Sequence, residues 1–128
     1  MLLDKNRKID YYATNPDWVC PTWYGYVPDC GSVAEMLYNA TKKRPVFIGK
    51  PEPQMAYLAM QKTGFEKHET VIIGDRLYTD IACGVNAGIT SVFVLSGEGT
   101  LKDLEESEKK PTFVYENVKE FLKDLKNN

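Results

Sequence analysis

From residue 45 onward, short runs of apolar, β-forming residues alternate with segments of helical character. The runs are continuously apolar, which is typical of strands buried on both faces of a parallel sheet. Alternation of strands and helices through short loops predicts right-handed βαβ units, and therefore an α/β fold with a doubly wound parallel sheet. The predicted strands are PVFIG (45–49), TVIIG (70–74), TSVFVLSG (90–97) and PTFVYE (111–116).

The helical segments between these strands carry their own end signals. PEPQMAYLAMQKTG has proline near its first turn and closes at Gly64, and YTDIACGVNAG closes at Gly88. Proline at the start and glycine at the end are the expected helix boundaries. The predicted helices are 51–64, 78–88, 101–110 and 117–128.

The first 44 residues follow a different pattern. KIDYYATNPD predicts a strand that ends at Ala13, followed by turn chemistry at Asn15-Pro16-Asp17. WVCPTWYGYVPDCG is rich in aromatic residues, proline and glycine, and predicts a long loop. Such a loop has two open interpretations, local packing of its aromatic side chains or a functional role.

SVAEMLYNATKK then predicts an amphipathic helix with Ser32 as its N-cap and Glu35 completing a capping box. The change of pattern after this helix predicts two parts, residues 1–44 and residues 45–128.

Composition excludes several classes of protein. The chain has 128 residues, a net charge of −2, 43% hydrophobic and 27% charged residues, an ordinary balance for a globular domain. It has no basic stripe for nucleic acid, no apolar stretch of membrane length and no signal peptide, so we expect a cytoplasmic protein. Cys20, Cys30 and Cys83 are odd in number and lack CxxC spacing, which disfavours disulfide and zinc sites. His68 lies in EKHET, a predicted solvated loop.

Charged side chains follow two of the predicted strands, at the sheet edge where α/β proteins bind ligands. Gly49 and Lys50 follow one strand, Asp75 follows the next, and Asp80 lies in the first turn of the helix after it. Two carboxylates facing one small space repel each other unless a cation lies between them. The pattern therefore predicts a Mg²⁺ site, with a lysine that offsets the charge of a phosphoryl group.

Each of these signals has a plainer interpretation when taken alone. Lys50 is compatible with an ordinary surface lysine, Asp75 with a turn residue, and Asp80 with a simple N-cap. The glycine loop SGEG (96–99) meets neither the Rossmann nor the P-loop spacing. The predicted Mg²⁺ and phosphate site therefore rests on the three residues occurring together and in this order along the chain.

That order and spacing resemble the haloacid dehalogenase-like (HAD) superfamily of phosphatases. GKPEP resembles its lysine motif and GDRLYTD resembles its acidic metal motif. ATNPD, VPDCGS, NAGITSVFVLSG and PTFVYENVKEFL resemble, in the same order, the NagD-like and p-nitrophenylphosphatase branch, which carries a large α/β cap. The resemblance implies that residues 45–128 form the C-terminal half of a three-layer, Rossmann-like HAD core, and that residues 1–44 are the tail of the cap.

The resemblance also implies roles for individual residues. Lys50 would contact the nucleophile and the substrate phosphate, and Asp75 would ligate Mg²⁺. Asp80 would support the metal site through water or by holding Lys50. The function implied is Mg²⁺-dependent hydrolysis of a small phosphorylated metabolite. The implied substrate-binding residues are Asn15 and Asp17 on the cap side, Gly49 and Arg76.

The chain departs from the family at its start. Members open with a D-x-D-G strand, whose first Asp is the nucleophile, and a second motif supplies Ser or Thr; neither is in this sequence. Asp4 in MLLDKNRK is the only early acid of this kind, but Asn6 and Arg7 stand where the second Asp and the Gly would be. We therefore expect a fragment that begins inside the cap and is inactive by itself.

Two other functions compete with this one. The chain could act as a non-catalytic binding or assembly module. A receiver-like signalling domain also uses acids and a lysine, but it needs its acids first, whereas here Lys50 precedes Asp75. In the HAD fold the strand TVIIG lies beside the nucleophile strand, so the resemblance predicts an exposed sheet edge and self-association through it.

Overall fold

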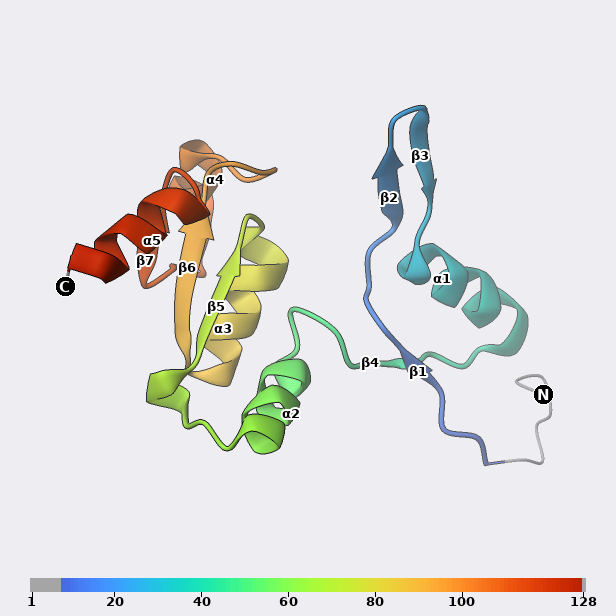
Figure 1. The fold of residues 1–128 in the computed structure, drawn as a ribbon. Coiled ribbons are helices and arrows are strands. Elements are labelled where there is room, and N and C mark those ends of the chain that lie inside the picture. Colours follow the sequence, from blue (N-terminus) through green and yellow to red (C-terminus); the bar gives the residue numbers. More distant parts are fainter. Residues whose placement is uncertain (1–7, 128) are drawn as a thin grey trace. The chain divides into compact units, whose positions relative to one another are not determined.

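The computed structural model describes residues 8–127, which form two compact units that divide between Gly49 and Lys50 (Figure 1). The division lies slightly later in the chain than the predicted boundary after residue 44. The assignment of the first part to a cap and the second to a core stays a prediction.

The first unit contains a short parallel pair of strands. Strand β1 (Tyr12–Ala13) pairs with β4 (Val46–Phe47), with Tyr12 opposite Val46 and Ala13 opposite Phe47. Gly49 follows β4 where the chain passes close to β1, since a Cβ at this position would lie 1.6 Å from the carbonyl oxygen of Thr14. The strand predicted to end at Ala13 is confirmed, and only glycine fits at position 49.

The predicted long loop in this unit is wrong. Strands β2 (Val19–Thr22) and β3 (Gly25–Pro28) form an antiparallel hairpin, closed where the Thr22 hydroxyl donates to the Gly25 carbonyl at 2.8 Å. Gly25 has φ +136°, which favours glycine in this tight turn. Pro21 and Pro28 concealed the strands, but proline is tolerated in exposed edge strands.

Helix α1 (Cys30–Thr41) begins earlier than predicted. Its N-cap is Asp29, whose side chain accepts a hydrogen bond from the Cys30 amide at 2.6 Å. Ser32 instead donates to the Trp18 carbonyl, and Glu35 pairs with Arg44 at 2.7 Å. The capping box predicted from Ser32 and Glu35 is therefore wrong, because an earlier acid already caps the helix.

The second unit is built on a parallel sheet, as predicted, but the predicted strand at 45–49 does not belong to this sheet, because β4 pairs with β1 instead. Within residues 50–127 the strand order is β5 (Val71–Gly74), β6 (Thr90–Val94), β7 (Phe113–Tyr115). Gly64 and Gly88 end helices α2 (Gln54–Thr63) and α3 (Ala82–Ala87) in the left-handed conformation, where they were expected. A 3-10 turn, Lys67–Glu69, holds the exposed His68, and a π-helical turn, Leu77–Ile81, precedes α3. The other helices of this unit are α4 (Leu101–Glu106) and α5 (Val118–Asn127).

Strand β6 forms the centre of this unit. Its residues from Ser91 to Val94 are all buried, which confirms burial on both faces, and Phe93 packs with Leu77 and Ile81. A Cβ at position 84 would lie 2.5 Å from Ile72 and 2.8 Å from Ser91, so Gly84 lets α3 pack directly on β5 and β6. The predicted α/β architecture is present.

Strand β5 differs from β6 in its burial. Val71 and Ile73 are 44% and 38% exposed, although the continuous apolar run predicted burial on both faces. The two exposed residues alternate with the half-buried Ile72, which packs against Gly84 of α3, so it is one face of β5 that is exposed. Within the described residues β5 also lies at the edge of the sheet, with a hydrogen-bonded neighbour only in β6. The carboxyl end of this edge strand carries the candidate site.

Between residues 8 and 127, every helix is too short or too polar to cross a membrane. Cys20, Cys30 and Cys83 are each free thiols.

Candidate active site

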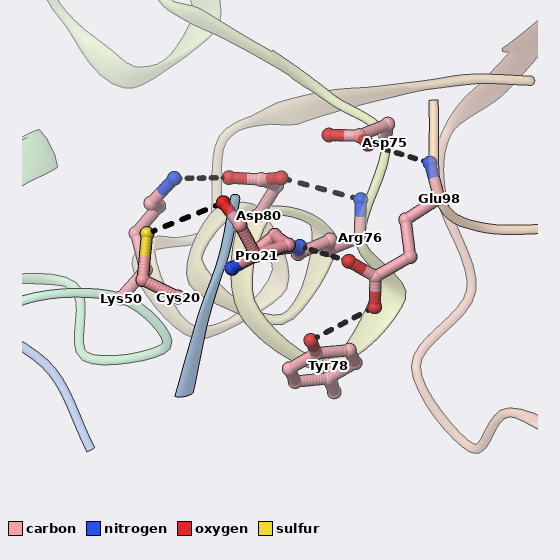
Figure 2. Close-up of polar contacts among 8 residues, drawn as sticks. All are labelled: Cys20, Pro21, Lys50, Asp75, Arg76, Tyr78, Asp80 and Glu98. Carbon is pink, nitrogen blue, oxygen red and sulfur yellow. Dashed lines mark hydrogen bonds and ion pairs between the residues drawn. The ribbon is translucent and has the colours of Figure 1, made fainter. Parts of the chain in front are cut away.

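Lys50 and Asp80, thirty positions apart in the sequence, form an ion pair at the carboxyl end of β5. The Lys50 Nζ lies 2.5 Å from Asp80 Oδ1, and the Arg76 amide donates to Asp80 Oδ2 at 3.2 Å (Figure 2). Both carboxylate oxygens of Asp80 are therefore engaged. Asp80 lies inside the π-helical turn, whose N-cap position belongs to Arg76, so Asp80 is not an N-cap.

Gly74, the residue before Asp75, makes room for this ion pair. A Cβ at position 74 would lie between 2.2 and 2.5 Å from side-chain atoms of Asp80. The glycine therefore lets the Asp80 carboxylate pass under the end of the strand. This role was missed from the sequence, although the Gly-Asp step at the strand end was its signal.

Asp75 is held by the glycine loop that follows β6. Its Oδ2 accepts a hydrogen bond from the Glu98 amide at 2.7 Å, and its backbone carbonyl accepts from the Gly99 amide at 3.0 Å. Its other carboxylate oxygen, Oδ1, makes no hydrogen bond with any described residue and points away from the Glu98 amide (Figure 2). Asp75 thus presents one oxygen that is open to a ligand.

Arg76 and Tyr78 hold the side chain of Glu98 beside this loop. Arg76 Nε lies 2.7 Å from Glu98 Oε2, and the Tyr78 hydroxyl donates to Glu98 Oε1 at 3.1 Å (Figure 2). A hollow of about 330 Å³ adjoins these groups and reaches Asp103 and Glu106 of α4. Arg76 was predicted to bind substrate, and that role stays a prediction, since its observed partner is Glu98.

The other predicted substrate-binding residues lie in the first unit. Asn15 Oδ1 accepts a hydrogen bond from the Asp17 amide at 3.0 Å, and the Asp17 carbonyl accepts from the Gly31 amide at 2.8 Å. The predicted turn chemistry is therefore present as an Asx turn. The roles of Asn15, Asp17 and Gly49 toward a substrate stay predictions, and Asp4 lies outside the described residues.

The described residues supply few alternative groups for catalysis. Across residues 8–127, no three His, Cys, Asp or Glu side chains converge to hold a metal ion. Burial raises the pKa of the Cys83 thiol, the nearby Lys50 ammonium lowers it in part, and the thiol donates to the Glu52 carbonyl. A buried thiol with a raised pKa is a poor nucleophile. Cys83 is therefore a poor candidate for the nucleophile at this edge.

Among known proteins, this chain is similar to hydrolases and phosphatases. A family model described as HAD-hydrolase-like matches residues 47–121. An acid sugar phosphatase of Staphylococcus aureus is 33% identical over 115 residues, which cover 90% of this chain and 44% of that protein. The sugar phosphatase activity in this name is that of the Staphylococcus aureus protein.

Solved structures agree in fold. The 4-nitrophenylphosphatase of Thermotoga maritima is 44% identical with a TM-score of 0.82, over 89% of this chain and 44% of that one. A glycerol phosphate phosphatase of Mycobacterium tuberculosis, solved in complex with magnesium, is 32% identical with a TM-score of 0.80, over 85% of this chain and 33% of that one. The chain thus spans less than half the length of each of these relatives.

Proposed function

The chain belongs to the HAD-like hydrolase family, and from this premise we propose that it serves in the Mg²⁺-dependent hydrolysis of a small phosphate monoester. Two observations carry the proposal, the ion pair of Lys50 with the buried Asp80 and the open oxygen of Asp75, which follows the same strand, β5. The named activities of the similar proteins support phosphate esters as the substrate class.

Lys50 is suited to contact a phosphoryl group. Its side chain is 51% exposed, whereas that of its partner Asp80 is 9% exposed, so the lysine reaches solvent while its ammonium is held by a buried carboxylate. An ammonium fixed in this way can stabilise the negative charge of a transferring phosphoryl group without reorganisation. Asp80 acts in this scheme by orienting Lys50.

The donor set at Asp75 fits Mg²⁺. This ion prefers carboxylate oxygens, usually takes only one or two of them, and keeps several waters together with phosphate oxygens. Asp75 Oδ1 would be the direct protein ligand, while both oxygens of Asp80 already have partners. When bound, the ion would polarise the phosphoryl oxygens and offset their charge.

Mg²⁺ binding by this chain is expected to be weak and to depend on Asp75 more than on Asp80. Asp75→Asn should remove most of the binding because it alters the direct ligand, and Asp80→Asn should weaken it by about tenfold through the supporting contacts. An NMR titration with Mg²⁺ measures this, with Glu105→Gln as a control at an exposed acid of α4. Tight wild-type binding, or a loss seen only in Asp80→Asn, would contradict the assignment.

The activity itself is tested by supplying the nucleophile. The chain would be co-expressed with the N-terminal portion of the Thermotoga maritima relative, which the family resemblance predicts to carry D-x-D-G. The complex would then be assayed with Mg²⁺ against p-nitrophenyl phosphate, sugar phosphates and glycerol phosphate. Failure of a folded complex to hydrolyse any of these esters would contradict the proposed function.

A further inference from the structure

The glycine loop at residues 96–99 lies against Asp75. Two of its amides, those of Glu98 and Gly99, donate to the carboxylate and the carbonyl of Asp75. Because both amides are directed at one aspartate of the chain itself, the loop does not act as a phosphate loop in this structure. It acts on the orientation of Asp75.

The spacing of the glycines has a steric explanation. A Cβ at position 97 would lie 2.0 Å from Asp75 Oδ2, and a Cβ at position 99 would lie 2.5 Å from the Asp75 carbonyl oxygen. Any side chain at either position would therefore push the loop away from Asp75. The sequence G-E-G allows the backbone to approach on both sides of Glu98.

The side chain of Glu98 fastens this loop to the segment that follows Asp75. Arg76 Nε and the Tyr78 hydroxyl engage its two carboxylate oxygens at 2.7 and 3.1 Å. Glu98 is thus bound at two places, through its amide to Asp75 and through its carboxylate to residues just beyond Asp75. The Arg76 and Glu98 side chains are 31% and 52% exposed, so solvent weakens their ion pair. The hydrogen bond from the Tyr78 hydroxyl is a second contact that holds the Glu98 carboxylate in the same position.

We propose that Glu98 is a positioning residue, which holds the loop so that its own amide fixes the Asp75 carboxylate with Oδ1 presented to a divalent cation. The proposal rests on the proposed function, because it takes Asp75 as the metal ligand. A carboxylate already held in one orientation loses less conformational freedom when the cation binds, and partners that orient a ligand typically raise metal affinity.

The test compares three variants of the full chain. Glu98→Ala removes the acceptor for Arg76 and Tyr78, while Glu98→Gln keeps an amide oxygen that can still accept a hydrogen bond. Glu106→Ala is the matched control, since it removes a carboxylate from the same hollow without touching the loop. Amide hydrogen exchange at residues 98 and 99, measured without metal, reports the loop, and NMR titration with Mg²⁺ reports the affinity.

We expect Glu98→Ala to lose exchange protection at both amides and to bind Mg²⁺ about tenfold more weakly. Glu98→Gln should retain most of both properties, and Glu106→Ala should match the wild type. Unchanged protection in Glu98→Ala would overturn the role of Glu98, as would lost protection with unchanged affinity. In either case a loss of binding in Asp75→Asn would leave the proposed function standing. Absence of Mg²⁺ binding by the wild type would instead overturn the metal site and the proposed function.

Discussion

Purified chain is expected to leave p-nitrophenyl phosphate intact in the presence of Mg²⁺, and co-expression with the N-terminal portion of the Thermotoga maritima relative is expected to produce hydrolysis. The reason is that the sequence contains no D-x-D-G, the motif that the family resemblance assigns to the nucleophile. Removing a nucleophile that works as part of a unit costs several orders of magnitude in rate. Release of p-nitrophenol, followed by absorbance, measures both results.

The same assay needs a control for contaminating phosphatases. The partner segment with its motif Asp changed to Asn should assemble with the chain and give no hydrolysis. Turnover by the chain alone that disappears in Asp4→Ala would contradict the prediction and assign the nucleophile to Asp4.

In the complemented enzyme, Lys50→Met is expected to reduce kcat by about 100-fold or more, the typical loss when one fixed charge-stabilising donor is removed. Lys62→Met is the matched control, because Lys62 is exposed near the end of α2. Lys50→Met also leaves Asp80 without its ion pair, and an unpaired buried charge destabilises a fold. Adding Asp80→Asn should restore the midpoint of thermal unfolding but not kcat, which separates catalysis from folding.

The isolated chain is expected to self-associate through β5. Within residues 50–127 this strand has a neighbour on one side only, and the sequence TVIIG contains no lysine, proline or charge to block further pairing. A hollow of about 230 Å³, lined mainly by apolar side chains of α2, β5 and α3, adjoins the strand. Exposed apolar patches and open edges of this kind favour association.

Light scattering over a concentration series measures this association. Val71→Lys should reduce it, because a charge on an edge strand opposes pairing with another strand. Val118→Lys is the control, since Val118 is similarly exposed, at 52% against 44%, but lies on α5. A monomer at all concentrations, with the amides of Val71 to Ile73 protected from exchange, would mean that this edge is already covered.

The order of elements in the second unit followed from the sequence alone, because its signals are local. Continuous apolar runs predicted β5, β6 and β7, and Gly64 and Gly88 predicted the ends of α2 and α3. In the first unit the local signals pointed to more than one structure. The prolines of β2 and β3 favoured a loop where a hairpin forms, and Ser32 was a plausible N-cap although Asp29 caps the helix. Which signal prevails there depends on tertiary packing, which the local sequence does not contain.

The same distinction holds for the candidate site. The sequence predicted that Lys50, Asp75 and Asp80 would lie at one edge, because the strands before them were expected to end at the same side of one parallel sheet. In the structure the strand before Lys50, β4, pairs with β1 instead, and Lys50 reaches the site through its ion pair with Asp80. The partner of each oxygen depended on the tertiary structure, since Lys50 and Asp80 are thirty positions apart and Glu98 reaches Asp75 across twenty-three. The glycines at 74, 97 and 99 make this point most directly. The sequence shows that these three positions have no side chain. Only the fold brings atoms of Asp75 and Asp80 so close to them that a side chain would not fit.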